Sequence, residues 1–435
     1  MRRRAKSSII VVLAMLMLPI TANAYENTTG KVIDAATKKP IKGALVTLSN
    51  TVLQTDENGS FPVANMPGWI GVRAPGYRRA EYVIPNPPGK GPIEIKLQPF
   101  SPKALYLTFY GIGDRKLREN ALKLIDETEL NALVIDVKGD RGAVTYKTSV
   151  PLASEIGGQK LIIVKDIKGL IKSLKERGIY TIARIVVFKD NLLGTAKPSL
   201  AIKTQDGKVW HDREDLVWVD PASREVWNYN INLAVEAAQN GFDEIQFDYV
   251  RFPDRKGLKF SIPNTEENRV NTISGFLAEA RKRLAPYNVF LAADIFGYVS
   301  WNLDDTQIGQ RLDRIVPCVD YISLMLYPSG FQFGIPGYRN PVAHPHEIVA
   351  LSLKRAQERT NIPTVRFRPW LQAFKDYAFD RRHFNGPEIR TQINAAEKFG
   401  SGGWMLWNPR NVYMSDGLKR KTTLSGAKAR PNGSG

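Results

Sequence analysis

Three aspartates stand near the ends of apolar, alternating segments, and their placement is the first sign of chemistry in this chain. They are Asp136, Asp248 and Asp294. Alternation with period two indicates β-strands. An unpaired carboxylate on the inner face of a strand is costly to bury, so each of these groups needs a partner or a function. Two carboxyl groups at one site can share the acid and the nucleophile or base roles of glycoside hydrolysis.

The strand pattern assigns each aspartate to a face. Asp136 shares its face with Lys138, opposite three large aliphatic side chains, and Asp248 and Asp294 likewise oppose apolar sets. Trp and Tyr side chains combine a flat apolar surface with a polar tip, which suits a sugar ring. Later segments add to the same end of the predicted sheet Tyr327, Arg366, Arg368, Gln372, Trp404, Trp407 and Asn408.

A simpler interpretation is that these acids form ordinary buried ion pairs without chemistry. The candidate partners are Arg184, Arg251, Arg366 and Lys138. Arg251 follows Asp248 by three residues and is its expected partner, and Lys138 is the expected partner of Asp136.

The chain from residue 104 onward supplies the elements that must position these residues. Strands alternate with amphipathic helices, and this alternation favours a (β/α)8 barrel, an α/β fold whose chemistry lies at the C-terminal ends of its strands. A doubly wound nucleotide-binding sheet is disfavoured because Gly111-Ile-Gly113 is only a fragment of its phosphate turn. We expect strands at 104–110, 131–138, 180–188, 244–250, 289–296, 321–327, 364–373 and 403–407, and helices at 114–127, 166–177, 223–240, 266–285, 307–315, 346–358 and 387–399.

Residues 28–98 show several short strands at regular spacing, which predicts a small all-β sandwich. Thr55-Asp-Glu-Asn-Gly-Ser-Phe61 and Ala74-Pro-Gly-Tyr77 are typical turns. Together with Gly30-Lys-Val-Ile-Asp34 and the segment 43–48, they make this stretch resemble the carboxypeptidase regulatory-like domain, a transthyretin-like sandwich. That resemblance implies a non-catalytic unit.

The two ends of the chain bear on its location. Residues 1–24 combine a basic start, an apolar run and Ala22-Asn-Ala24, which predicts a cleaved secretory signal peptide, with an uncleaved membrane anchor as the alternative. We therefore expect a periplasmic or secreted protein without a membrane span after cleavage. Residues 416–435 are predicted to form a basic disordered tail.

The composition narrows the classes of partner. The formal net charge of +18 suits an anionic polysaccharide or an envelope surface, although plain solubility explains it equally well. No nucleic-acid motif is visible.

The single Cys318 allows no intramolecular disulfide, and the lack of a Gly-x-Ser-x-Gly elbow argues against an α/β-hydrolase. His344 and His346 have no acidic partner at regular spacing, so we expect no metal and no other cofactor.

Residues 104–415 resemble the glycoside hydrolase barrel family first catalogued as a domain of unknown function, which is similar to the amylase-like and α-galactosidase-like barrels. The specific match is Gly241-Phe-Asp-Glu-Ile-Gln-Phe-Asp-Tyr-Val-Arg-Phe-Pro253. The resemblance implies a TIM barrel with glycosidase-like chemistry on a polysaccharide. It implies that Asp248, at the end of the fourth strand, is the nucleophile, and that Asp294 is the general acid where amylase-like barrels carry Glu. Supporting matches are the segments 132–138, 292–297, 320–328 and 403–408.

The sequence therefore supports an exported glycoside hydrolase with Asp248 and Asp294 as the catalytic pair. The alternative is a polysaccharide-binding envelope protein whose barrel has no catalytic activity. Asp136 and Arg368 would position the sugar. The predicted substrate-binding residues are Asp136, Lys138, Arg251, Tyr327, Arg368, Trp404, Trp407 and Asn408.

Overall fold

The computed structural model describes residues 28–49, 51–63, 68–84 and 93–421. The predicted signal peptide lies outside the described residues, as does the chain beyond residue 421. The start of the predicted disordered tail is ordered, which corrects that expectation for residues 416–421. Arg420 pairs with Thr128 in a β-bridge, and the backbone N–H of Lys421 donates to the carbonyl of Glu127 at 2.9 Å. Within the described residues, no helix has the length and apolarity needed to cross a membrane.

The N-terminal unit is built from two small sheets that enclose one apolar core. In the first, β1 pairs with β4 antiparallel and with β7 parallel; the second has the antiparallel order β3-β2-β5-β6. Val46, Phe61 and Ile70 are among the side chains buried between them. The predicted small all-β unit is therefore present. Its strands are β1 (Thr28–Asp34), β2 (Leu45–Leu48), β3 (Thr51–Gln54), β4 (Ser60–Val63), β5 (Trp69–Arg73), β6 (Ala80–Val83) and β7 (Ile93–Leu97).

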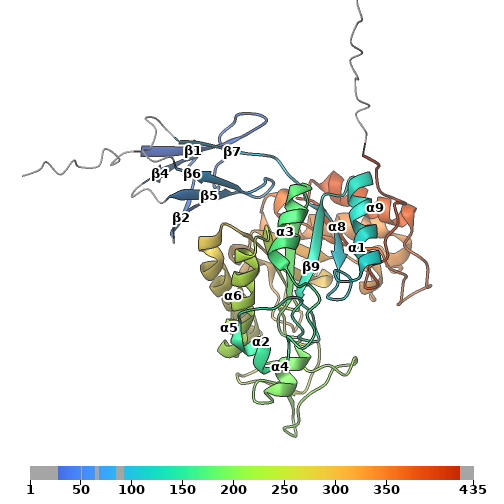
Figure 1. The fold of residues 1–435 in the computed structure, drawn as a ribbon. Coiled ribbons are helices and arrows are strands. Elements are labelled where there is room, and N and C mark those ends of the chain that lie inside the picture. The colour runs from blue at the N-terminus through green and yellow to red at the C-terminus, as the bar shows by residue number, and fades with distance from the viewer. Residues whose placement is uncertain (1–27, 50, 64–67, 85–92, 422–435) are drawn as a thin grey trace, which may run out of the picture.

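Eight parallel strands then close into a barrel, as the sequence predicted (Figure 1). All eight expected strands exist, although the seventh is short because residues 364–366 form a 3-10 turn before it. The remaining short strands, β11 (Lys203–Thr204) and β13 (Leu258–Lys259), pair outside the barrel. The barrel strands are β8 (Lys103–Leu107), β9 (Ala132–Lys138), β10 (Tyr180–Val186), β12 (Glu244–Asp248), β14 (Phe290–Phe296), β15 (Tyr321–Met325), β16 (Trp370–Gln372) and β17 (Trp404–Trp407).

The helices that surround the barrel begin and end at the expected signals. Asp114 and Ser223 accept backbone hydrogen bonds at helix N-termini, and Gly178, Gly241 and Gly400 follow three helices with positive φ. Helices α2 and α4, in the loops after β9 and β10, were not expected. The helices are α1 (Arg115–Glu127), α2 (Pro151–Glu155), α3 (Ile167–Glu176), α4 (Asn191–Ala196), α5 (Arg224–Gln239), α6 (Glu266–Leu284), α7 (Leu312–Ile315), α8 (Pro345–Thr360) and α9 (Gly386–Phe399).

The barrel has two apolar regions, one on each side of its strands. The larger lies between the strands and the helices. The smaller fills the barrel interior and includes Tyr106, Ile182, Trp370 and Met405. The interior is thus a packed core. The C-terminal ends of the strands, where barrels of this kind carry their chemistry, are called the mouth below.

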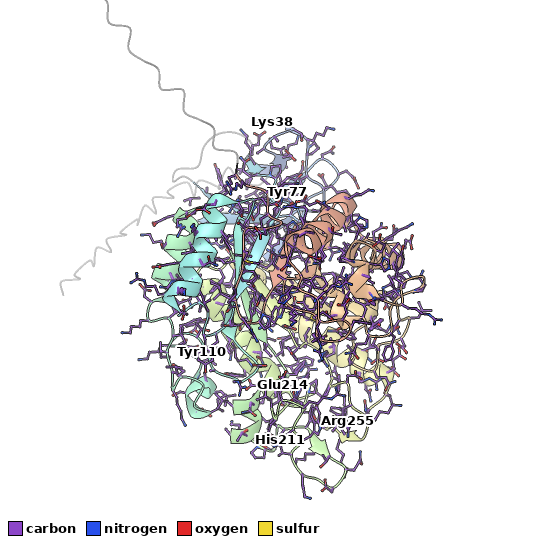
Figure 2. All side chains as sticks on the ribbon, turned by 90° about the vertical axis from the view of Figure 1, so that its right-hand side faces the viewer. Lys38, Tyr77, Tyr110, His211, Glu214 and Arg255 are labelled. Atoms are coloured by element: carbon purple, nitrogen blue, oxygen red, sulfur yellow. The ribbon has the colours of Figure 1, made fainter. Side chains whose placement is uncertain are left out.

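The N-terminal sandwich sits against the opposite end of the barrel, which we call the floor. The backbone N–H of Gly76 donates to the hydroxyl of Tyr321 at 3.0 Å, and Arg79 forms an ion pair with Asp243 at 3.2 Å. Figure 2 shows the two ends apart: Lys38 and Tyr77 of the sandwich are at one end, and residues of the loops after barrel strands are at the other. Those labelled loop residues are Tyr110, His211, Glu214 and Arg255.

Candidate active site

Arg184 is the centre of the charged cluster at the mouth. It projects inward from β10, between Asp136 of β9 and Asp248 of β12. Its Nη1 donates to Oδ1 of Asp136 at 2.7 Å, and its Nε and Nη2 both donate to Oδ2 of Asp248, at 2.9 and 2.6 Å. All three residues are at most 5% exposed. Burial alone would lower the pKa of Arg184, but Tyr106 and the two carboxylates raise it well above the ordinary value, so the guanidinium stays charged.

Asp248 is held from its own strand as well. The next residue, Tyr249, has φ 48°, an uncommon conformation for an aromatic residue. The chain leaves the strand at this point, and the backbone N–H of Tyr249 donates to Oδ1 of Asp248 at 2.6 Å. Both oxygens of Asp248 therefore accept hydrogen bonds from positive or polarised donors, which stabilise a carboxylate.

Asp136 is the second acid that pairs with Arg184, and its other oxygen also accepts hydrogen bonds. Its Oδ2 accepts from the hydroxyl of Tyr106 at 2.7 Å and from the backbone N–H of Phe109 at 3.2 Å. Burial raises the pKa of Asp136, and Arg184 opposes that shift. Both oxygens of Asp136 therefore accept hydrogen bonds, one of them from the guanidinium of Arg184.

Asp294 occupies a different environment although it is at the same level of the barrel. The last paired residues of β12 and β14 are Phe247 and Ala293, so Asp248 and Asp294 follow side by side on neighbouring strands. Trp370 Nε1 donates to Oδ1 of Asp294 at 2.7 Å, whereas Oδ2 is buried and has no hydrogen-bond partner among the described residues. Burial, and then the charge of Asp248, raise the pKa of Asp294 well above its ordinary value.

Aromatic side chains line the same end of the barrel. Trp407 stacks on Tyr106 with ring centroids 4.1 Å apart and planes at 8°, and the guanidinium carbon of Arg184 lies 4.9 Å from the Trp407 ring. Tyr327 follows β15, and its ring centroid lies 6.5 Å from that of Trp407. The structure thus brings together Asp136, Asp248, Asp294, Tyr327 and Trp407, five of the residues singled out from the sequence.

Arg251 lies beside this cluster but does not pair with Asp248, which corrects the expected ion pair. Its guanidinium packs over the rings of Trp218, at 4.9 Å, and Tyr249, at 5.4 Å, and Nη1 donates to the carbonyl of Phe252. The left-handed turn at Tyr249 redirects the chain before Arg251, so Arg184, from the neighbouring strand, becomes the partner of Asp248.

Lys138 ends β9 at the mouth, but its side chain does not face the barrel interior, and the reason is an irregularity in β9. Asp136 is opposite Arg184, but Lys138 is opposite Ile185, so β9 carries one extra residue there. This bulge reverses the side-chain alternation. Lys138 turns toward the helices and forms an ion pair with Asp190 at 2.5 Å, with both side chains fully buried.

Three further predicted substrate-binding residues differ in where they lie: Arg368 and Trp404 are away from the mouth, and Asn408 directly follows β17 at the mouth. Arg368 faces the interior but lies at the floor, where it is fully buried and bonded to Glu244 and to the carbonyl of Gly402. Trp404 faces the helices, because positions 404 and 407 cannot share a face of one strand. The Asn408 amide donates to the carbonyls of Ala373 and Val412 and so ties two loops together.

Sequence reasoning did not select Arg184, Tyr106 or Trp370 as site residues. For Arg184 a signal existed, because the alternation of 180–186 places it on the same face as the acids of the neighbouring strands. Its identity as the shared partner of Asp136 and Asp248 depends on the strand register, which is visible only in the fold.

The comparison with family models supplies the class of the barrel. A model described as "Putative glycosyl hydrolase domain" matches residues 104–413, more than half of the chain. The chain belongs to this family. It is accordingly a glycoside hydrolase, with a TIM barrel preceded by small β-sheets. No curated protein matches the sequence significantly.

Solved structures show what the chain is similar to. A hypothetical protein from Ruminiclostridium thermocellum ATCC 27405 is 39% identical, covering 44% of this chain and 96% of its own, with a TM-score of 0.39. The glycoside hydrolase domain of PgaB (BpsB) from Bordetella bronchiseptica is 13% identical, covering 72% of this chain and 95% of its own, with a TM-score of 0.53. A chitinase from Chromobacterium violaceum ATCC 12472 is 13% identical over 70% and 93% of the two chains, with a TM-score of 0.41. The likeness to PgaB concerns the barrel fold.

Proposed function

We propose that the protein is an exported glycoside hydrolase that cleaves a polysaccharide with two carboxyl groups, Asp248 and Asp294. The observation that carries this proposal is the contrast between their surroundings. Asp248 accepts hydrogen bonds from Arg184 and from a backbone N–H, whereas Asp294 is buried with one oxygen free and a raised pKa. Acid–nucleophile catalysis uses two carboxyl groups in unlike surroundings, one of which has a raised pKa and donates the proton.

The reaction follows from those states. An oxygen of ionised Asp248 bonds to the anomeric carbon while the bond from that carbon to the leaving oxygen breaks, and Asp294 gives its proton to the leaving oxygen. Water then loses a proton to Asp294 and displaces Asp248. Neighbouring strands lie about 4.8 Å apart, which favours the short carboxyl separation of retaining enzymes, about 5–5.5 Å, over the wider one of inverting enzymes.

Residues around the pair supply the binding. Tyr327 and Trp407 offer ring faces for the sugar. Arg251 is partly exposed and held by two aromatic rings, and among the described residues it has no carboxylate within ion-pair distance. Its remaining donors can bind an acidic group of the substrate, so we propose an anionic polysaccharide, in keeping with the basic chain.

The location and the N-terminal unit complete the proposal. The predicted signal peptide supports a periplasmic or secreted enzyme. The two packed sheets of residues 28–97 support the assignment to the carboxypeptidase regulatory-like class, as a non-catalytic unit attached to the barrel floor.

The experiment compares the wild type with Asp248→Asn on neutral and acidic polysaccharides, measuring the release of reducing ends and, separately, binding. The wild type should release product and Asp248→Asn should lose at least about a hundredfold in rate while binding is retained. Asp254→Asn, an exposed substitution in the loop after β12, is the matched control and should behave as the wild type. Equal binding with no product from either protein would eliminate the hydrolase assignment.

A further inference from the structure

A run of aromatic rings leads from the surface of the mouth to the charged cluster. Tyr377 stacks on Phe374 with centroids 6.2 Å apart and planes at 11°, and Phe374 contacts Tyr327 at 5.5 Å. Tyr327 in turn lies 6.5 Å from Trp407, which stacks on Tyr106. The outer four rings, those of Tyr377, Phe374, Tyr327 and Trp407, are called the aromatic track below.

Exposure falls along the track. Tyr377 is 49% exposed, Phe374, Tyr327 and Trp407 are partly exposed, and Tyr106 beneath them is buried. These residues belong to β16, β15 and β17 or to the loops that follow them, so the track occupies one side of the mouth. Its inner end is next to Arg184, whose guanidinium lies over Trp407 and binds Asp248.

The loop that carries Tyr377 is firmly fixed. Asp376 is 2% exposed and accepts hydrogen bonds from the Ser329 hydroxyl at 2.6 Å and from the backbone N–H groups of residues 378, 379 and 381. Gln372 of β16 joins the same network through the backbone and hydroxyl of Ser329. Tyr377 is therefore half-exposed on a loop that buried polar groups hold in place, and it continues the row of contacting rings out to the surface.

On the opposite side of the mouth, positively charged side chains cover the aromatic rings. There the rings of Trp218 and Tyr249 are covered by cations, Arg251 on both and Lys189 on Tyr249. Among the described residues, no Lys or Arg lies over Tyr327, Phe374 or Tyr377, so no cation covers the faces of these three rings.

A glycine keeps the space between two members of the track open. A side-chain carbon added at Gly330 would lie 3.9 Å from Cβ of Tyr327 and 4.0 Å from the hydroxyl of Tyr377. Both contacts are of ordinary van der Waals length, so a larger side chain would fit the backbone and fill the gap between the rings.

We propose that the aromatic track binds consecutive sugar residues of an extended polysaccharide and guides the chain to the bond next to Asp248. The proposal rests on the function proposed above. It adds to it the side of the mouth from which the polysaccharide enters, and the requirement that the polysaccharide be long enough to cover the track. Successive centroids lie 6.2, 5.5 and 6.5 Å apart, with planes at 11°, 72° and 39°, so the four rings form one continuous aromatic surface. The substrate is therefore a polymer that reaches several residues beyond the point of cleavage on this side, and short oligosaccharides are poor substrates.

The test uses short and long oligosaccharides of glucose, N-acetylglucosamine and galacturonic acid with the full chain. Tyr377→Ala should reduce kcat/KM about tenfold for long members, mainly through KM, and leave the shortest cleaved member unchanged. Gly330→Val should have the same length-dependent effect without removing a ring. Phe333→Ala, which removes an aromatic side chain that is 90% exposed and outside the track, should have no effect at any length.

Binding of the same oligosaccharides to Asp248→Asn, followed by tryptophan fluorescence, tests the track without turnover. Affinity should rise with length in Asp248→Asn and lose that rise when Tyr377→Ala is added. If the wild type cleaves glycans but Tyr377→Ala and Gly330→Val lower the rate by one factor at every length, the track is refuted and the enzyme assignment stands. If affinity rises along the track but no variant or wild type cleaves any glycan, the enzyme assignment is refuted and the track stands.

Discussion

Two of the three carboxyl groups at the mouth, those of Asp136 and Asp248, pair with a single arginine, Arg184. Arg184 has enough donors for Asp136 and Asp248 but makes no hydrogen bond to Asp294. The acid left without this partner is the one whose pKa burial raises most strongly toward the neutral form. The two neighbouring acids are therefore in unlike surroundings: Arg184 holds Asp248 by hydrogen bonds, and burial raises the pKa of Asp294.

The raised pKa of Asp294 predicts a pH-dependent gain in stability for Asp294→Asn. A carboxyl group whose pKa is higher in the folded than in the unfolded chain stabilises the fold below its unfolded pKa, near pH 4, and this contribution is lost as the pH rises through the folded value. Asparagine does not ionise. Asp294→Asn should therefore melt at a higher temperature than the wild type at neutral pH, with a difference that vanishes toward pH 4.

The same variant should lose activity, by about 10²–10⁴-fold, because the proton donor is gone. The wild-type rate should fall on the alkaline side as Asp294 ionises. Thermal unfolding across pH, with Asp254→Asn as the control that shows no pH-dependent difference, checks the first outcome, and the pH–rate profile checks the second. A melting temperature of Asp294→Asn below that of the wild type at neutral pH would contradict the raised pKa.

At the level of single residues, alternation was enough to predict which acids face inward, and the choice of Asp136, Asp248 and Asp294 needed nothing more. Alternation did not show which basic side chains form ion pairs with these acids. Arg251 is near Asp248 in sequence, yet Arg184 is its partner through the register of two parallel strands. Trp404 was grouped with Trp407 against the alternation itself, and the structure separates them.

At the level of elements, one extra residue in β9 decides the environment of a lysine. The bulge turns Lys138 out of the barrel and into contact with Asp190, which also caps α4 by accepting from the backbone N–H of Leu193 at 3.0 Å. A bulge leaves no mark in a pattern of apolar residues, because each half of the strand alternates correctly. The apolar pattern was enough to predict the strands and most helices. It could not predict the bulge, and so it could not predict the side of β9 on which the Lys138 side chain lies.

The fully buried pair of Lys138 and Asp190 predicts an asymmetric set of stabilities. Asp190→Ala should lower the free energy of unfolding by about 3–5 kcal/mol, because it leaves a buried ammonium group without a partner and removes the cap of α4. Lys138→Met combined with Asp190→Asn removes both charges and keeps a capping oxygen, so it should lose much less. Urea denaturation of both variants measures the difference. Equal losses would mean that the ion pair itself, rather than an unpaired charge, determines the stability.

At the level of the whole molecule, the sandwich and the mouth lie at opposite ends of the barrel (Figures 1 and 2). Among the described residues, the sandwich contributes none to the charged cluster, and its hydrogen bonds and ion pairs with the barrel lie at the floor. They include buried polar groups: Arg73 lies 3.7 Å from Asp320, and Arg79 reaches Asp243, which also accepts from the backbone and hydroxyl of Thr181 on β10. The sandwich is therefore part of the support of the barrel strands.

This support predicts that the two units unfold together. Asp243 binds Arg79 of one unit and Thr181 of the other while it is largely buried, so a separated barrel would expose the floor and leave Asp243 without this cation. A single calorimetric transition is expected for the full chain. Arg79→Ala should lower the free energy of unfolding by about 1.5–3 kcal/mol, the range for a hydrogen bond to a charged group, and should shift the whole transition. Lys42→Ala, which breaks a solvent-exposed pair with Glu57 within the sandwich, is the matched control and should change little. Two resolved transitions, with only the smaller moved by Arg79→Ala, would show instead that the sandwich is an independent module and that the barrel floor is stable without it.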